Sequence, residues 1–339
     1  MITNNTPAGS PAYGSGVPAA DRRLPWNVMG KRLDGMDYAS TADALADNGL
    51  NYQVEMWNLA GVHPQTGATL PAANLRTVVR PMPDGSHKVL AASGVRYTPI
   101  QNDVAFAVAD DLKADHGAKI VGAADFRSGG ASLMVVDLTA PVTLVTPDGT
   151  EDRTDLFLAI KNAHDGSAAL TFAFTPVRIA CTNALPAAIS GAVRAWKINH
   201  TPNAQERVDL AAKAIRDAVA YRDAFTVAAQ AMMDQAMSDR EFDAIVARMF
   251  PVAEGREATK AGQNALEVRA QMTSLYGQSE TLEGIRGTLW GGYNAITEWY
   301  DWARPVRQAG EDVARAEGAL EGPYTRRKAN VWDTFLQAV

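Results

Sequence analysis

Three Asp-Gly turns, each set between runs of alternating apolar and polar residues, constrain the fold of this 339-residue chain more than any other feature. An Asp-Gly pair suits a tight β-turn because it tolerates positive φ, and the alternation matches the two-residue period of a half-buried strand. Closely spaced hairpins of this kind favour antiparallel sheet over a doubly wound parallel fold. The turns are Pro83-Asp84-Gly85, Pro147-Asp148-Gly149 and His164-Asp165-Gly166.

The flanking runs predict strands between about residue 50 and residue 180. A first strand is predicted over Asn51–Trp57, and a helix over Gln101–Leu112, ended by Gly117. The other strands are predicted at Arg76–Arg80, Lys88–Ala92, Lys119–Phe126, Ala131–Leu138, Val142–Val145, Leu156–Ala163 and Ala168–Phe174.

Beyond residue 204 the apolar residues recur at helical spacing. A capping box at Ser238–Glu241 predicts a helix that ends before Pro251, and further helices are predicted over Gly255–Leu275 and Thr281–Trp302. The chain is therefore predicted to be α+β, with a mainly antiparallel β-hairpin core and a short helix over residues 25–203, followed by a helical C-terminal third over residues 204–339. Residues 1–24 are predicted to be a disordered arm, because they are rich in small, turn-forming residues.

Composition narrows the possible function classes. The chain is 47% hydrophobic and 21% charged, as expected of a folded protein, and its net charge is −6. A site for a polyanion must therefore be a local basic patch. The single cysteine, Cys181, excludes an internal disulfide framework, and no apolar run is long enough for a membrane span or signal peptide. We expect a cytoplasmic protein without a membrane partner.

Common cofactor and metal motifs are missing from the sequence. Neither the phosphate-binding GxxxxGK[ST] loop nor a dinucleotide-binding GxGxxG turn is present, and the five histidines are too scattered to form a paired metal motif. We therefore expect no cofactor, no metal site and no hydrolysis of nucleotides by a phosphate-binding loop.

Two local features leave catalysis open. Cys181 follows a predicted strand and precedes a predicted helix, where helix amides and Arg178 could lower the thiol pKa. A compact buried cysteine is the favoured interpretation, since unpaired cysteines usually pack as small hydrophobes. His164 beside Asp165 could share a proton, but the same residues suit a structural hairpin turn better. No catalytic residue is assigned.

Basic and aromatic residues alternate between Arg194 and His200, as in grooves that bind single-stranded nucleic acid by charge and base stacking. The alternative for this segment is a half-buried edge strand, with Trp196 and Ile198 on one face and Lys197 on the other. The candidate nucleic-acid-binding residues are Arg96, Tyr97, Arg127, Arg178, Arg194, Trp196 and Lys197.

Several motifs together resemble the phage/plasmid-like protein family catalogued as domain of unknown function 932, in order and spacing over roughly residues 25–305. The resemblance implies a mobile-element protein of DNA replication or recombination, and it transfers no enzymatic activity. One departure is Cys181-Thr-Asn-Ala-Leu185, where relatives often have Cys-Gln-Asn-Thr-Leu. The motifs are Trp26–Gly30, Gly94–Asn102, Asn162–Ser167, Thr175–Leu185, Ile198–Thr201 and Gly287–Tyr300.

The layout also loosely resembles phage single-strand annealing proteins of the RecT and Red-beta type, which form rings or filaments on DNA. This resemblance implies a homo-oligomer that binds and anneals single-stranded DNA without bond chemistry. One alternative is a protein-binding factor, such as a host-defence antagonist or a mobile-element maintenance factor, that uses the acidic surface and the helical third. The other is an enzyme that uses Cys181 with His164 or His200.

Overall fold

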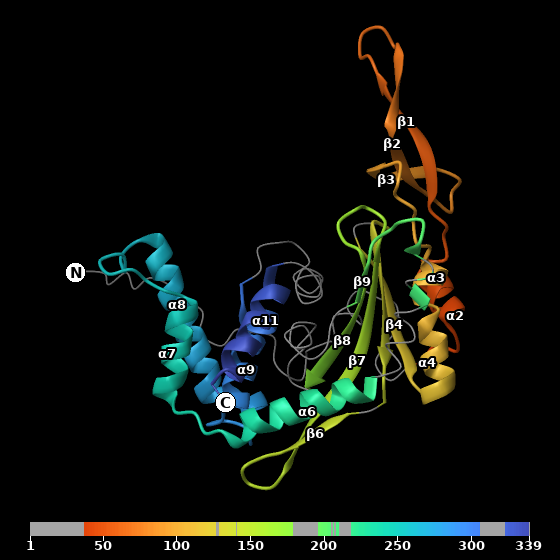
Figure 1. The fold of residues 1–339 in the computed structure, drawn as a ribbon. Coiled ribbons are helices and arrows are strands. Elements are labelled where there is room, and N and C mark those ends of the chain that lie inside the picture. Colours follow the sequence, from red (N-terminus) through yellow and green to blue (C-terminus); the bar gives the residue numbers. More distant parts are fainter. Residues whose placement is uncertain are drawn as a thin grey trace, which may run out of the picture.

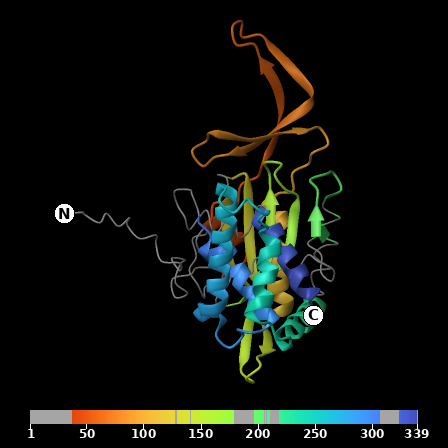
Figure 2. The same cartoon turned by 90° about the vertical axis from the view of Figure 1, so that its left-hand side faces the viewer.

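In the computed structural model, a large antiparallel sheet and a set of helices form a body from which a smaller sheet projects (Figures 1 and 2). The described residues are 37–126, 129–139, 141–178, 196–204, 206, 208–209, 218–305 and 323–338. The observed architecture is α+β, as predicted. The predicted arm at residues 1–24 lies outside the described residues.

The body is built on a six-stranded antiparallel sheet in the order β4-β5-β7-β8-β9, with β6 beside β7. Each predicted Asp-Gly turn is confirmed: Gly85, Gly149 and Gly166 have φ of 81°, 86° and 76°. A residue with a Cβ atom adopts such angles only with strain, which is why glycine follows aspartate there. The strands are β4 (Lys119–Phe126), β5 (Ala131–Asp137), β6 (Val142–Val145), β7 (Glu151–Ala163), β8 (Leu170–Arg178) and β9 (Trp196–Ile198).

A three-stranded sheet extends beyond one end of the body (Figure 2). It contains β1 (Glu55–Val62), β2 (Thr69–Pro81) and β3 (His87–Gly94), each antiparallel to the next. The first strand was predicted over Asn51–Trp57, and that position is wrong by several residues. Residues 51–54 are tied to the body instead, where Val54 exchanges two hydrogen bonds with the Gln101 side chain.

Three short helices pack beside the large sheet (Figure 1). They are α2 (Thr41–Asp47), α3 (Asn102–Phe106) and α4 (Val108–His116). Helices α2 and α4 contact the edge strand β4, and α3 contacts β7. Ser40 caps α2, because its side chain accepts a hydrogen bond from the Asp43 amide. The single helix predicted over Gln101–Leu112 is two helices that meet at Ala107, and the second ends at Gly117 in the left-handed region.

The C-terminal part is helical, with α6 (Ala218–Asp234), α7 (Asp239–Met249), α8 (Lys260–Gln278), α9 (Leu289–Glu298) and α11 (Pro323–Leu336). The capping box at Ser238 and Glu241 is confirmed. The helix predicted from Thr281 begins only at Leu289, because Gly284 and Gly287 have positive φ. A 3₁₀ turn (Glu280–Leu282) precedes it and a π-helical segment (Trp299–Ala303) follows it.

One apolar core joins the large sheet to the helices. At the base of the body α6 contacts β6, and the Gln230 side chain exchanges two 2.9 Å hydrogen bonds with the Val145 backbone. From α9, Trp290 donates a 3.0 Å hydrogen bond to Asp152 of β7. Across the described ranges, no helix combines the length and the apolar character needed to cross a membrane.

Candidate functional site

Four of the seven candidate nucleic-acid-binding residues have described side chains, namely Arg96, Tyr97, Trp196 and Lys197. Arg127 and Arg194 lie outside the described residues, as does Cys181. Arg178 ends β8, and only its backbone is described.

The fold brings Tyr97 and Thr98 beside His200, three residues after Lys197, although about 100 positions separate them in sequence. The Thr98 amide donates a 3.2 Å hydrogen bond to the His200 carbonyl. The rings of Tyr97 and His200 stack with centroids 5.1 Å apart and planes 11° from parallel. The segment after β3 therefore runs beside the segment after β9, which the sequence pattern did not predict.

We call Arg96, Tyr97, Trp196 and Lys197 the Tyr97 surface. The two cations are exposed and the two aromatic residues are partly buried. Trp196 packs edge-on against Phe174, and β9 lies at the edge of the sheet, which agrees with the alternative interpretation of this segment as an edge strand. The Trp196 ring therefore belongs partly to the core.

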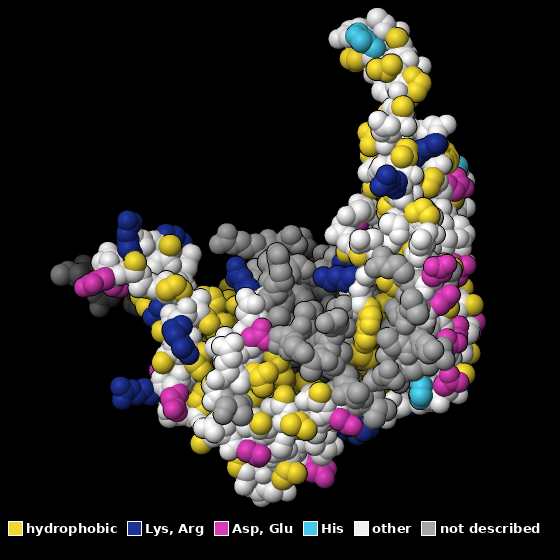
Figure 3. Space-filling view, viewed as in Figure 1, with side chains coloured by type: hydrophobic (Ala, Val, Ile, Leu, Met, Phe, Trp, Pro, Cys, Tyr) yellow, Lys and Arg dark blue, Asp and Glu magenta, His cyan; other side chains and the backbone are white. Residues whose placement is uncertain are grey.

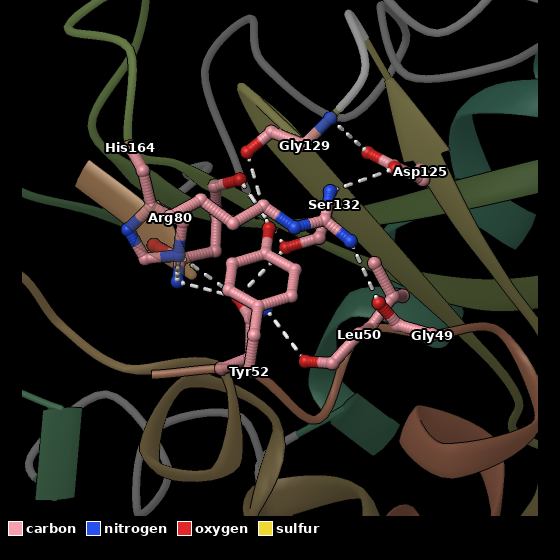
Figure 4. Close-up of polar contacts among 10 residues, drawn as sticks. Gly49, Leu50, Tyr52, Arg80, Asp125, Gly129, Ser132 and His164 are labelled. Atoms are coloured by element: carbon pink, nitrogen blue, oxygen red, sulfur yellow. Dashed lines mark hydrogen bonds and ion pairs between the residues drawn. The ribbon is translucent and has the colours of Figure 1, made fainter. Parts of the chain in front are cut away.

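A buried polar cluster lies directly beneath the Tyr97 surface. We call it the histidine cluster; its members are Asn102, Ser132, Asn162, His164 and His200. Asn102 stands at its centre, and its Oδ1 atom accepts hydrogen bonds from Ser132 Oγ at 2.8 Å and Asn162 Nδ2 at 3.1 Å. Its Nδ2 atom donates to the Leu50 carbonyl at 2.9 Å. Figure 4 shows Ser132, His164 and Leu50 gathered around this centre.

Hydrogen bonding assigns the tautomers of both histidines. His164 Nε2 lies 3.1 Å from Asn102 Oδ1, which can only accept, and 3.4 Å from Asn162 Nδ2, which can only donate; the shorter contact favours the tautomer with the hydrogen on Nε2. His200 Nδ1 faces the Ile100 amide at 3.1 Å, so it accepts and the hydrogen is on Nε2. Burial, and then the neighbouring His200, lower the pKa of His164 to about 3, and burial lowers the pKa of His200 to about 4. Both rings are therefore neutral near pH 7.

Four buried polar atoms of this region have no hydrogen-bond partner among the described residues: His164 Nδ1, His200 Nε2, Asn162 Oδ1 and the Tyr97 hydroxyl oxygen. An unpaired buried polar group costs about 1–3 kcal/mol, so a cluster of them marks a place where water or a ligand group fits. His200 Nε2 offers a hydrogen, whereas His164 Nδ1 and Asn162 Oδ1 offer lone pairs. This mixture suits a neutral group that both donates and accepts better than an anion or a metal cation.

The cluster is poorly suited to proton transfer near neutral pH. A general base works best when its pKa lies near the operating pH, and a value of about 3 makes His164 a weak base there. The described residues also contain no group of three or more His, Cys, Asp or Glu side chains placed to hold a metal ion. The arrangement therefore favours holding groups in position over acid–base chemistry.

A family model for a domain of unknown function, DUF932, matches residues 89–320, which is more than half of the chain. The chain belongs to the DUF932 family. The matched range includes the Tyr97 surface and the whole histidine cluster, but it begins after β1 and β2. No curated protein and no solved structure matches the chain.

In this DUF932 protein, one arginine from the projecting sheet, Arg80, lies beside the histidine cluster. Arg80, buried at the body end of β2, forms a 3.1 Å ion pair with Asp125 and donates a 3.0 Å hydrogen bond to the Gly49 carbonyl. Its guanidinium carbon lies 3.9 Å from the centre of the Tyr52 ring (Figure 4). Arg80 thereby anchors the projecting sheet to the body of the DUF932 fold.

Glycines make this anchoring possible. Gly129 has a φ of 93°, and a Cβ atom there would collide with the Arg80 guanidinium. At Gly130 a Cβ atom would collide with Asp165, while the Gly130 carbonyl accepts hydrogen bonds from the His164 and Asp165 amides at 2.8 and 3.1 Å. The adjacent glycines were the available sequence signal, but they did not identify Arg80 as their neighbour.

Proposed function

We propose that this protein binds single-stranded DNA and promotes annealing as a homo-oligomer, without breaking or forming covalent bonds, in the recombination or replication of a phage- or plasmid-type element. The observation that carries the proposal is the stack of Tyr97 on His200, with the exposed Arg96 next to Tyr97 in sequence and the exposed Lys197 three residues before His200. Exposed cations beside a partly exposed aromatic ring are the features that bind phosphates and stack bases of a single strand.

The distribution of charge supports a local site on this acidic protein. Asp and Glu side chains gather along the outer edge of the body over α2 and α4, whereas Lys and Arg side chains lie on the projecting sheet, beside the hollow of the body and over α7 and α8 (Figure 3). A DNA strand is repelled by the first surface and attracted by the second. The acidic members are Asp43, Asp47, Asp110, Asp111 and Asp115.

The histidine cluster supports the proposal by holding the aromatic stack in place. His200 accepts a hydrogen bond from the Ile100 amide, and Ile100 in turn accepts one from Asn162 at 2.8 Å. These contacts fix the His200 ring on which Tyr97 stacks. A pre-positioned ring loses little conformational entropy when a base stacks on it, which favours binding.

Fluorescence anisotropy with a labelled single-stranded oligonucleotide tests the proposal. We expect binding that prefers single strands over duplex and weakens log-linearly with salt. Arg96→Glu/Lys197→Glu should weaken binding about tenfold or more and reduce the salt slope by roughly one unit per cation. The control Arg240→Glu/Lys260→Glu makes the same charge change at exposed positions on α7 and α8 and should bind like wild type.

Either of two outcomes contradicts the proposal: no binding by the wild-type protein at low salt, or equal loss in the test and control variants. The acidic surface over α2 and α4 would then favour the alternative function, a protein-binding factor such as a host-defence antagonist or a mobile-element maintenance factor that binds a basic partner. A stoichiometric partner whose binding is lost after charge reversal of Asp43 and Asp111 would support that alternative.

A further inference from the structure

The three strands of the projecting sheet carry their opposite charges on separate faces. Side chains alternate between the two faces of a sheet, and residues paired across strands share a face. The cations of these strands all share one face, because Arg76 and Arg80 are four residues apart in β2 and Lys88 of β3 pairs with Arg80. Glu55, the one acidic residue of the three strands, pairs with Val79 and lies on the opposite face. We call the face that carries the three cations the basic face.

Side-chain contacts agree with this assignment of faces. On the basic face, Arg76 donates a hydrogen bond to Asn58, its partner in the register. On the opposite face, the Trp57 and His87 rings have centroids 4.8 Å apart, and the Trp57 indole donates a 2.7 Å hydrogen bond to Glu55. The carboxylate of Glu55 is therefore held away from the basic face.

The basic face adjoins the Tyr97 surface. Leu75, which precedes Arg76 in β2, pairs with Gly94 at the end of β3. The Gly94 carbonyl accepts a 3.0 Å hydrogen bond from the Tyr97 amide, in a turn that also contains Arg96. Only this turn separates the row of Arg76 from the Tyr97 surface, so one extended ligand can contact both.

The basic face also meets the body on the side of the histidine cluster. Its Arg80 lies over the Tyr52 ring, and that ring contacts His164 edge-on with centroids 6.1 Å apart. The same cluster holds His200, on which Tyr97 stacks. Figure 3 shows Lys and Arg side chains on the projecting sheet above the body.

Arg76 lies at the centre of a row of polar side chains that crosses the sheet. The register places Asn58 of β1 on one side of it and Ser93 of β3 on the other. The Ser93 hydroxyl oxygen is buried and has no hydrogen-bond partner among the described residues. Arginine, asparagine and serine side chains are common donors to the phosphate oxygens of DNA. A phosphate bound at Arg76 would accept the unused hydrogen of Ser93.

We propose that a single DNA strand bound at the Tyr97 surface continues onto the basic face, where Arg76, Asn58 and Ser93 hold one of its phosphates. The inference rests on the proposed function, because it extends the path of the same strand. It predicts a site longer than the Tyr97 surface. A short strand is held by that surface alone, whereas a longer strand also reaches Arg76.

Fluorescence anisotropy with single strands of increasing length, from roughly 4 to roughly 16 nucleotides, tests this extension. Arg76→Gln should bind the shortest strands like wild type. It should bind the longest about fivefold more weakly at about 0.1 M salt, because one phosphate contact on a single strand contributes roughly 0.7 to the salt slope. The matched control Val89→Glu makes the same change in net charge at a 66% exposed position on the opposite face, and it should bind all lengths like wild type.

Ser93→Ala separates the phosphate contact from folding. A buried hydroxyl without a partner contributes little to the folded state, so this variant should unfold in urea at the same or a higher concentration than wild type. It should nevertheless bind the longest strands about threefold more weakly or worse, because a hydrogen bond to a charged group is lost. Long-strand binding by Ser93→Ala as tight as in wild type would overturn the contact at this row.

The length series distinguishes failure of this inference from failure of the proposed function. Unchanged binding by Arg76→Gln at every length, or an equal loss in Val89→Glu, would overturn the path along the basic face while DNA binding at the Tyr97 surface stands. No binding of any strand by the wild-type protein would refute the proposed function itself. Far-ultraviolet circular dichroism verifies that the compared variants are folded.

Discussion

His164 and His200 are edge-to-face neighbours, with ring centroids 6.1 Å apart, and both remain neutral because burial leaves no solvent to stabilise a positive charge. Asn102 Oδ1 binds the hydrogen on His164, and the Ile100 amide occupies the lone pair of His200. The hydrogen positions on these two rings and the polar atoms left unpaired therefore depend on residues up to 100 positions away in sequence.

The lowered histidine pKa values predict loss of stability on acidification. The folded pKa values are about 3 and 4, below the ordinary value of 6.5, so the unfolded chain binds protons that the folded chain does not. The stabilising contribution is complete above pH 6.5 and is lost as the pH falls from there towards 4. Each histidine should lower the free energy of unfolding by up to about 1.4 kcal/mol per pH unit in this window.

Urea unfolding at pH 7 and pH 5 measures this effect. His164→Asn should reduce the difference between the two pH values, because it removes one of the two buried titrating rings. His116→Asn, at an exposed position on α4, should leave the difference unchanged. Equal stability of the wild-type protein at the two pH values would contradict the prediction.

Some helices and turns are predictable from a few neighbouring residues, because one residue type satisfies the conformation or the hydrogen bond that the backbone needs at that position. The Asp-Gly turns and the Ser238 capping box are examples. Glycine adopts the positive φ that each turn needs, and the Ser238 side chain accepts a hydrogen bond from a helix amide that would otherwise be unpaired. Predictions failed where tertiary contacts decide. The extended segment before Glu55 binds the Gln101 side chain instead of a neighbouring strand.

The glycine turn between β4 and β5 provides a prediction at the scale of elements. Gly129→Ala should lower the free energy of unfolding by about 2–4 kcal/mol, because it strains the backbone and displaces Arg80 from Asp125. Gly149→Ala at φ 86° carries the same kind of backbone strain in a turn with open space around it, so it should cost only about 1–2 kcal/mol. Urea denaturation compares the two; equal losses would show that the Arg80 contact adds nothing.

At the scale of the whole molecule, one core extends from the large sheet into the C-terminal helices. Its members include Phe172 of β8, Trp290 of α9 and Phe335 of α11, all nearly inaccessible to solvent. The hydrogen bond between Trp290 and Asp152 ties the helices to β7 across 138 positions. The boundary near residue 204 in the predicted organisation therefore separates types of secondary structure that share one core.

This shared core predicts cooperative unfolding of the sheet and the helices. Far-ultraviolet circular dichroism and tryptophan fluorescence should give the same urea midpoint, because the buried tryptophans lie on helices packed against the sheet. Phe335→Ala should shift both midpoints together and lower stability by about 3–5 kcal/mol. Two separate transitions would show that residues before and after the helical boundary unfold independently.

The sequence by itself determined the α+β class, most strands of the large sheet, their hairpin turns and the capped helices, because alternation, turn chemistry and capping act over a few neighbouring residues. Seven candidate nucleic-acid-binding residues came from the same patterns, and of the four with described side chains the structure places Tyr97 against His200, close in sequence to Trp196 and Lys197. Only the tertiary structure decided that Tyr97 stacks on His200, that Arg80 anchors the projecting sheet and that Asn102 organises two buried histidines. Those contacts join residues far apart in the chain, and their energies come from burial and hydrogen-bond geometry that exist only after the chain has folded.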